Sequence, residues 1–361
     1  MNPTQALSRA GQSLWLDNIT RELLTSGALE RYIDELSVTG LTSNPTIFDQ
    51  AIKHGAAYDA ELRELSRAQL TSEQLFFEIA LRDLTAAADL FWPVHERTAG
   101  VDGWVSLEVS PMLAHDTRAT LAQAKDLHAR AGRANLFIKI PGTPEGLPAI
   151  EEATFAGIPV NITLLFSREQ YLAAAEAYLR GIERRIEAGL SPEIASVASL
   201  FISRWDVAVA GKAPPALVNQ LGLAIGHRTY KAYSDLMRTS RWRRVFNAGA
   251  RPQRLLFAST GTKTSNASDI LYVKGLVAPL TINTMPEATL RAYAHHGELG
   301  AELAIDGGDS ERVLAEFVRA GIRLEPLAAQ LQEEGAQAFV NSWNDLLNVI
   351  TAKSGALAKA G

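Results

Sequence analysis

Eight short runs of β-branched and other apolar residues recur along the chain, and longer segments with a helical period separate them. The runs span residues 13–17, 38–44, 103–110, 136–141, 160–166, 196–203, 255–259 and 277–283. Such alternation is typical of parallel strands joined by crossover helices. Eight strands with seven helical connections predict an α/β fold, the closed (β/α)8 or TIM barrel, whose functional groups gather at the carboxyl ends of the strands.

The segments between the runs carry helix signals. Residues 72–91 place apolar side chains at a spacing near 3.6, and Ser167 with Gln170 forms a capping box that opens a helix reaching Gly189. A doubly wound sheet would have a glycine-rich phosphate-binding turn after its first strand. The first run here ends in Asp-Asn-Ile-Thr instead, so that fold is disfavoured.

The chain continues well beyond the eighth run. Residues 286–295 have the pattern of the eighth barrel helix, and residues 309–360 that of two or three more helices, which would cover a barrel end or form an oligomer contact. No linker or internal repeat divides the sequence. We therefore expect residues 1–361 to form a single barrel domain with extra C-terminal helices from about residue 309.

Composition narrows the classes of function. Lysine and arginine number 35 against 40 aspartates and glutamates, so the net charge of −5 argues against a nucleic-acid partner but allows a local cationic pocket for one phosphate. The absence of cysteine excludes disulfides, thiolate zinc sites and a cysteine nucleophile, and favours a reducing compartment. The first thirty residues lack a signal-peptide core, and no run of about 18 apolar residues could span a bilayer. We expect a cytoplasmic protein without a membrane partner.

Of the nine lysines, Lys139 is the one that lies inside an apolar, strand-like run, Leu-Phe-Ile-Lys-Ile-Pro-Gly. Burial disfavours the charged ammonium and leaves the neutral amine that attacks a carbonyl. Lys139 is therefore a candidate for a Schiff base. The alternative is a lysine that reaches water from a strand end or pairs with a structural carboxylate.

The run 103–110 separates polar from apolar side chains with a period of two. Its even positions include Ser106 and Glu108, whereas its odd positions are valine and leucine. A polar face toward the axis and an apolar face toward the helices is expected of a barrel strand near its active end. Glu108 would then lie near Lys139 on the next strand. The alternative is an edge strand with its polar face in water.

Other runs also end on polar side chains. The same parity puts Thr42 and Asn44 on one face of the second run, and Asn161 and Thr163 on one face of the fifth. Thr and Asn are also common in turns and caps, and Asp17, which ends the first run, has the position of a helix N-cap. Taken together with the amine, these groups make a plausible constellation for acid–base chemistry through an imine.

Metal binding is not predicted. The seven histidines are scattered, and neither a His-x-x-x-His pair nor an Asp-rich loop with ligand spacing occurs.

The sequence resembles the transaldolase family, with similar segments in the same order along nearly the whole chain. The similar segments are 14–17, 40–45, 105–109, 138–143 and 160–166, and 198–204, 258–263 and 283–286 are similar to its longer bacterial branch. The resemblance implies a barrel enzyme of the pentose phosphate pathway that needs no cofactor and acts on sugar phosphates. It would move a dihydroxyacetone unit reversibly from sedoheptulose 7-phosphate to glyceraldehyde 3-phosphate, giving erythrose 4-phosphate and fructose 6-phosphate.

The resemblance also implies roles for individual residues. Lys139 would form the Schiff base with the ketose, and Asp17 would take the C4 hydroxyl proton during carbon–carbon cleavage. Glu108, through a water held with Thr163, would move protons during imine formation. The remaining groups would bind substrate: Thr42 would orient Asp17 or its neighbours, and the dihydroxyacetone unit would be held by Asn44 and Asn161.

Phosphate binding departs from the shorter members of that family. They carry an arginine two residues after the serine that corresponds to Ser259, where this chain has Gly261. By resemblance we expect Arg204, five residues after Ser199, to bind the distal phosphate with Ser259 and Lys263. The alternative for Arg204 is a surface ion pair with the nearby Asp206.

Two other functions are compatible with the same residues. A class I Schiff-base aldolase would protonate and release the three-carbon enamine, and a non-catalytic barrel would bind sugar phosphates without turnover. We expect a monomer or a homodimer.

Overall fold

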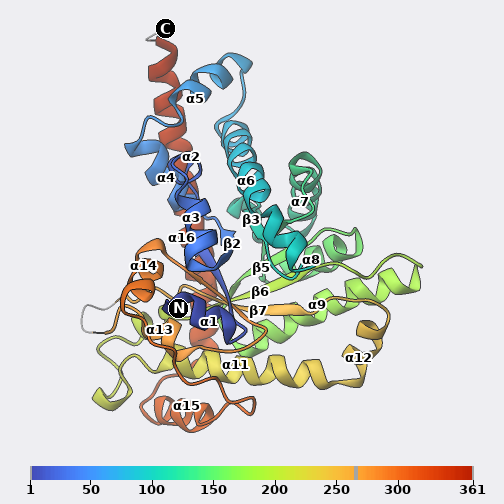
Figure 1. Ribbon diagram of the computed structural model, residues 1–361, viewed down its shortest axis with the longest axis vertical. Helices are drawn as coiled ribbons and strands as arrows, with labels where there is room; N and C mark the ends of the chain where they lie inside the picture. The colour runs from blue at the N-terminus through green and yellow to red at the C-terminus, as the bar shows by residue number, and fades with distance from the viewer. Residues whose placement is uncertain (1, 264–266, 360–361) are drawn as a thin grey trace.

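The computed structural model describes residues 2–263 and 267–359. Eight parallel strands close into a barrel in the order of the sequence, which confirms the (β/α)8 prediction (Figure 1). The strands are β1 Ser13–Asp17, β2 Val38–Thr42, β3 Trp104–Glu108, β4 Leu136–Pro141, β5 Val160–Leu165, β6 Ser196–Phe201, β7 Gln253–Ala258 and β8 Ile282–Met285.

The eighth strand was predicted in the wrong place. The apolar run 277–283 begins in the loop after α13, and β8 covers only Ile282–Met285. Val277 and Ala278 are buried, but the chain turns before the strand, where Leu280 adopts a left-handed φ of 60° and Thr281 Oγ1 donates to Ala278 O. Burial in a turn leaves the same apolar signal as burial in a strand, which explains the error.

Helices surround the barrel. They are α1 Pro3–Arg9, α2 Arg21–Thr25, α3 Ala28–Leu36, α4 Pro45–His54, α5 Asp59–Leu65, α6 Ser72–Arg97, α7 Thr117–Ala131, α8 Gly146–Phe155, α9 Arg168–Glu187, α10 Ser203–Ala208, α11 Leu221–Arg238, α12 Ser240–Asn247, α13 Leu271–Gly275, α14 Glu287–His296, α15 Ser310–Arg319 and α16 Leu324–Lys359, with 3-10 turns η1 Ser66–Ala68, η2 Pro111–Leu113 and η3 Pro215–Leu217.

The predicted helix signals hold, with shifts at the ends. Ser167 Oγ accepts from Gln170 N at 3.1 Å and Gln170 Oε1 accepts from Ser167 N at 3.2 Å, so the capping box opens α9 as predicted. The helix expected at 72–91 continues to Arg97 and includes Pro93. Among the described residues beyond 309 there are two helices, α15 and α16, and α16 runs along α4 and α5 at one end of the barrel (Figure 1).

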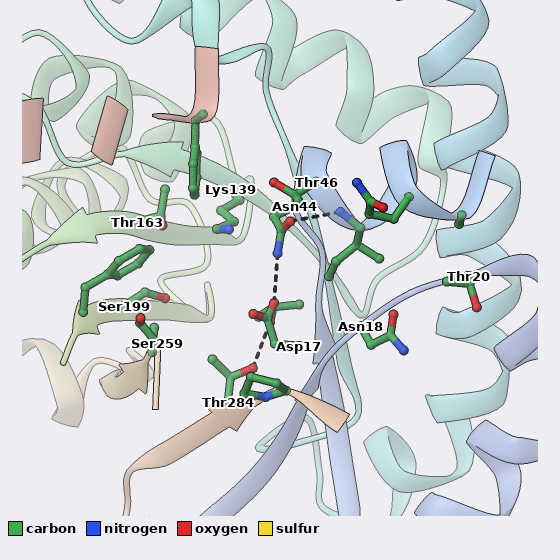
Figure 2. A pocket seen from close by; sticks show the side chains of 18 of the residues that line it. Asp17, Asn18, Thr20, Asn44, Thr46, Lys139, Thr163, Ser199, Ser259 and Thr284 are labelled. Atoms are coloured by element: carbon green, nitrogen blue, oxygen red, sulfur yellow. Dashed lines mark hydrogen bonds between the residues drawn. The ribbon is translucent and has the colours of Figure 1, made fainter. Parts of the chain in front are cut away.

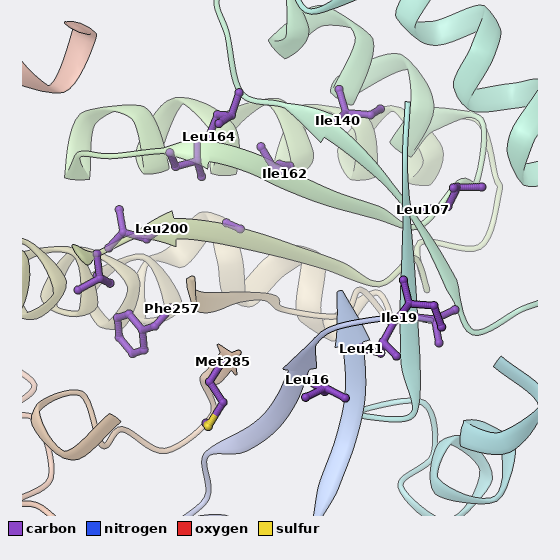
Figure 3. Close-up of a cluster of buried hydrophobic side chains, with 14 of the residues drawn as sticks. Leu16, Ile19, Leu41, Leu107, Ile140, Ile162, Leu164, Leu200, Phe257 and Met285 are labelled. Carbon is purple, nitrogen blue, oxygen red and sulfur yellow. The ribbon is translucent and has the colours of Figure 1, made fainter. Parts of the chain in front are cut away.

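Side chains alternate between the barrel interior and the helices. Outward-facing apolar residues of successive strands join the main core beneath the helices, as Figure 3 shows for Leu16, Leu41 and Leu107. Inside, a second cluster that includes Trp15 and Trp104 fills the lower barrel. Trp15 takes the space of a β2 side chain: a Cβ on Gly40 would lie 2.5 Å from the indole, so only glycine fits there.

On several strands the inward positions change from apolar to polar toward the carboxyl end. Trp15 precedes Asp17, Phe137 precedes Lys139, and the same change occurs from Val197 to Ser199 on β6. Apolar packing therefore fills the middle of these strands, and a buried Arg254–Asp102 ion pair lies nearer their amino ends. The polar groups at the carboxyl ends lie where TIM barrels carry their active sites.

None of the described helices is both long enough and apolar enough to cross a bilayer.

Candidate active site

A cavity of about 730 Å³ opens at the carboxyl ends of the strands. Figure 2 shows Lys139 and Thr163 on neighbouring strands, with Asp17 and Asn44 across from them. The cavity is lined by most of the residues that the sequence singled out: Asp17, Thr42, Asn44, Lys139, Thr163, Ser199, Arg204, Ser259 and Lys263. Glu108 and Asn161 are not part of the lining; both are buried and contact residues near it.

Lys139 and Glu108 form an ion pair inside the barrel. They are direct partners in the β3–β4 register, Lys139 Nζ lies 3.0 Å from Glu108 Oε2, and each residue is only 5% exposed. Lys139 Nζ also donates to Ser43 O at 3.2 Å. Because β3 lies between β2 and β4 in a closed barrel, the edge-strand alternative for Glu108 is wrong.

Burial raises the pKa of the Glu108 carboxyl; the charge of Lys139 acts against this rise, and the charge of Asp17 adds to it. A carboxyl with a raised pKa gives up and takes back a proton near neutral pH more readily than an exposed one. Glu108 Oε1 and Thr163 Oγ1 are both buried without a hydrogen-bond partner among the residues that the structure describes. These two atoms are therefore available to a substrate oxygen or to a water at the reacting carbon.

Asp17 belongs to the cavity and not to a helix cap. Its Oδ1 accepts a hydrogen bond from Thr42 Oγ1 at 2.9 Å, and Thr42 is its direct partner in the β1–β2 register. Thr42 Oγ1 also lies 2.8 Å from Thr284 Oγ1 on β8. The N-cap of α2 is Thr20, whose Oγ1 accepts from Leu23 N, so the capping alternative for Asp17 is wrong.

Asn44 both caps a helix and lines the cavity. Its Oδ1 accepts from Ile47 N and caps α4, which fixes the side chain. Its Nδ2 points at Asp17 Oδ1 with a long contact of 3.5 Å (Figure 2). The capping interpretation and the site interpretation of this residue therefore hold together.

Asn161 is oriented by both of its polar atoms. Its Nδ2 donates to Ser106 Oγ at 3.0 Å, and its Oδ1 accepts from Ser199 Oγ at 2.7 Å. In the β4–β5 register Asn161 is the partner of Lys139. A fully buried amide with one fixed orientation is suited to hold a polar group of a ligand next to the amine.

Arg204, Ser259 and Lys263 all line the cavity. Ser259 has a left-handed φ of 55°, and its hydroxyl lies 2.8 Å from Ser203 Oγ at the start of α10. Arg204 and Lys263 are exposed, and neither has an ion-pair partner within the described parts of the chain. The predicted alternative, an Arg204–Asp206 pair, is wrong, because the Asp206 carboxylate accepts from Leu221 N, Gly222 N and Tyr272 Oη.

Several site residues escaped the sequence analysis. Thr284 was missed because the eighth strand was predicted too early. Phe339 of α16 lines the cavity, and its ring centroid lies 5.4 Å from Lys139 Nζ. No local signal marks a phenylalanine on a C-terminal helix as a neighbour of a strand lysine.

Within residues 2–263 and 267–359, no group of three or more His, Cys, Asp or Glu side chains has the arrangement of a metal site.

Comparison with known proteins connects this geometry to a family. The profile of the Transaldolase/Fructose-6-phosphate aldolase family matches residues 14–350. A transaldolase of Thermobifida fusca is 45% identical over 356 residues, covering 96% of this chain and 97% of the relative. Transaldolases of a Parafrankia species and of Thiobacillus denitrificans are each 42% identical, covering 99% and 96% of this chain and 99% of each relative. The chain therefore belongs to the transaldolase family.

Proposed function

We propose that this protein is a transaldolase, which moves a dihydroxyacetone unit from sedoheptulose 7-phosphate to glyceraldehyde 3-phosphate and gives erythrose 4-phosphate and fructose 6-phosphate, reversibly. The observation that carries the proposal is the buried Lys139 amine, 3.0 Å from Glu108, at the base of the cavity. Relatives named transaldolase that match nearly the full length of the chain support the same reaction.

The first step joins Lys139 to the donor ketose. The neutral amine attacks the C2 carbonyl, and the resulting carbinolamine loses water to give a protonated imine. The oxygen that leaves needs a proton, and Glu108 is the buried carboxyl beside the amine. Thr163 Oγ1, which has no other partner among the described residues, would hold the water that links the carboxyl to the reacting carbon.

The second step breaks the bond between C3 and C4. Asp17 takes the proton of the C4 hydroxyl, the C3–C4 bond breaks, and the electron pair moves into the imine, which becomes an enamine. The aldose phosphate then leaves. Thr42 holds the Asp17 carboxylate in place, while Asn44 and Asn161 hold the hydroxyls of the three-carbon unit.

The third step reverses the second with another aldehyde. The enamine carbon attacks the acceptor carbonyl, and Asp17 returns its proton to the new hydroxyl. Hydrolysis of the imine releases the product and restores the Lys139 amine. The protonated imine is the electron sink for the pair that carbon–carbon cleavage releases, so the proposed reaction requires no metal ion to stabilise a carbanion.

The distal phosphate would bind at the cationic side of the cavity. Arg204, Ser259 and Lys263 all line it, and neither cation is engaged by a carboxylate within the described parts of the chain. Guanidinium and phosphate form strong charge-assisted hydrogen bonds. Ser199 also lines the cavity, and its hydroxyl donates to Asn161 Oδ1.

Replacing Arg204 with alanine is expected to raise the KM for fructose 6-phosphate about tenfold or more with a smaller change in kcat, because a hydrogen bond to a charged group contributes about 1.5–3 kcal/mol. Steady-state kinetics with varied donor measures this. Arg118→Ala, at an exposed position on α7, is the matched control. Unchanged kinetics for Arg204→Ala would remove this residue from the phosphate site.

Borohydride reduction tests the proposed reaction itself. With fructose 6-phosphate alone, intact mass and peptide mapping are expected to show a three-carbon adduct on Lys139. Added erythrose 4-phosphate is expected to remove that adduct as sedoheptulose 7-phosphate forms. A folded protein that gives no adduct would refute the Schiff-base reaction and favour a sugar-phosphate-binding barrel.

We propose further that residues 1–361 fold as one barrel domain, as a monomer or a homodimer. The last helix supports a single unit, because Lys353 of α16 donates to Ile52 O of α4 at 2.7 Å and lies 2.7 Å from Asp59 Oδ1 of α5. These contacts attach α16 to the N-terminal part of the barrel. Size-exclusion chromatography with light scattering separates the two oligomeric states.

A further inference from the structure

We infer that Phe339, on the C-terminal helix α16, shields the Lys139 intermediate from solvent and so decides whether the three-carbon unit is transferred or released. The inference rests on the proposed transaldolase reaction and assigns a specificity-determining role to a residue outside the barrel strands. It is carried by the position of the Phe339 ring, whose centroid lies 5.4 Å from Lys139 Nζ in the cavity wall.

The helix that carries Phe339 is held against the strands that carry the catalytic groups. Gln332 Nε2 donates to Gly142 O at 3.0 Å and to Leu164 O at 2.9 Å, at the ends of β4 and β5. A Cβ on Gly335 would lie 3.0 Å from the Leu164 side chain, so the helix approaches β5 closely at a residue without a side chain. This part of α16 therefore has a fixed distance from Lys139 and Thr163.

A second set of contacts holds α16 on the other side of Phe339. Thr46 Oγ1 of α4 donates to Ser342 Oγ at 2.9 Å, and Trp343 is buried against the aromatic rings of Phe76 and Phe77. Positions 332, 335, 339 and 342 are spaced by three or four residues, which puts them on one helix face. Anchors on both sides make Phe339 a fixed part of the wall.

Phe339 is also distinct from its neighbours on α16. Of the α16 residues whose side chains the structure describes, it is the one that lines the cavity. It is only partly buried, although it packs against the main core. Its ring thus covers the amine on the side of the cavity, while Glu108 and Ser43 O contact the amine directly.

The chemistry gives this cover a function. In transfer, the electron pair of the enamine forms a carbon–carbon bond with the acceptor aldehyde. In release, the same pair takes a proton from solvent and forms a C–H bond; water then adds to the imine carbon, the C–N bond breaks, and dihydroxyacetone leaves with the oxygen of that water. An apolar ring over the nitrogen restricts the solvent that supplies this proton, so it slows release and leaves time for an acceptor.

The test measures the ratio of release to transfer. Each variant receives fructose 6-phosphate and a fixed concentration of erythrose 4-phosphate, and dihydroxyacetone is quantified against sedoheptulose 7-phosphate. We expect Phe339→Ala to raise the ratio about tenfold, which corresponds to about 1.4 kcal/mol between the two barriers. Phe339→Leu, which keeps an apolar side chain in place, is expected to restore most of the wild-type ratio.

A ratio is independent of how much of the protein is folded, so it separates shielding from a structural role. Leu347→Ala is the matched control, because Leu347 is also a partly buried α16 residue packed on the core but does not line the cavity. Transfer and release that fall together in Phe339→Ala, with an unchanged ratio, would overturn the inference alone. A wild-type protein with neither transfer nor a borohydride adduct would overturn the proposed function, and this inference with it.

Discussion

Replacing Lys139 with alanine is expected to lower transaldolase activity by about 10⁴-fold or more, because among the residues that the structure describes no other buried amine lines the cavity. Lys139 is the lysine that lies in the barrel interior at the base of the cavity, whereas Lys263 is exposed at its rim. Coupled assays of product formation and borohydride trapping both measure the loss. A variant with normal turnover would refute the imine mechanism.

Loss of folding must be separated from loss of chemistry. The matched control is Lys125→Ala, which removes an exposed lysine on α7. Circular dichroism and thermal unfolding are expected to show that Lys139→Ala still folds, because Glu108 can take up a proton when its ion-pair partner is gone.

The pH dependence of stability gives an independent check on the pair. Burial raises the pKa of Glu108, and Lys139 opposes that rise, so the pKa rises further in Lys139→Ala. The folded variant then keeps a proton that the unfolded chain loses above the ordinary value of 4.5. Because the folded state binds more protons, the stability of the variant should fall relative to wild type as pH rises above that value. A difference independent of pH would contradict the coupling.

Asp17→Asn is expected to lower kcat by about 10²- to 10⁴-fold, the usual range for removing a general base. The amide keeps the shape of the side chain and its contact with Thr42, so binding of the ketose and imine formation should persist. Borohydride should then trap the intact six-carbon sugar phosphate on Lys139, where wild type gives the three-carbon adduct. Mass spectrometry distinguishes the two adducts directly.

Asp34→Asn is the control for this substitution, since Asp34 is an exposed carboxylate away from the catalytic cavity. The assignment of Asp17 fails if Asp17→Asn accumulates the three-carbon adduct at the wild-type rate. Such a result would leave another group to take the C4 hydroxyl proton.

The barrel itself could be predicted because its information is local. The strands alternate with a period of two, and the inner face of several of them changes from apolar to polar toward the carboxyl end, as from Trp104 to Glu108 on β3. Once the strands are neighbours in sequence order, parity places Lys139 and Glu108 inside the barrel on adjacent strands, and the register of the structure makes them direct partners. The one misplaced strand, β8, shows the limit: burial of Val277 in a turn has the same local signal as burial in a strand.

Alternatives for single residues needed the structure. The sequence left Asp17 as a base or a cap, and the tertiary structure assigns the cap to Thr20. It left Arg204 as a phosphate ligand or as the partner of Asp206, whose carboxylate the structure shows engaged by α11 and Tyr272. In both cases the deciding contact depends on how the elements pack, and the local sequence around Asp17 or Arg204 does not indicate it.

The sequence by itself determined the eight-stranded barrel, the place of Lys139 and Glu108 on the inner faces of neighbouring strands and the family of the chain, because strand parity and motif order are properties of residues close together along the chain. Only the tertiary structure decided what covers that pair. Phe339 reaches Lys139 because Gln332 bonds to the ends of β4 and β5 and because Trp343 is buried beside α6. These contacts join distant parts of the chain, and they form only when the completed barrel offers α16 a surface to pack on.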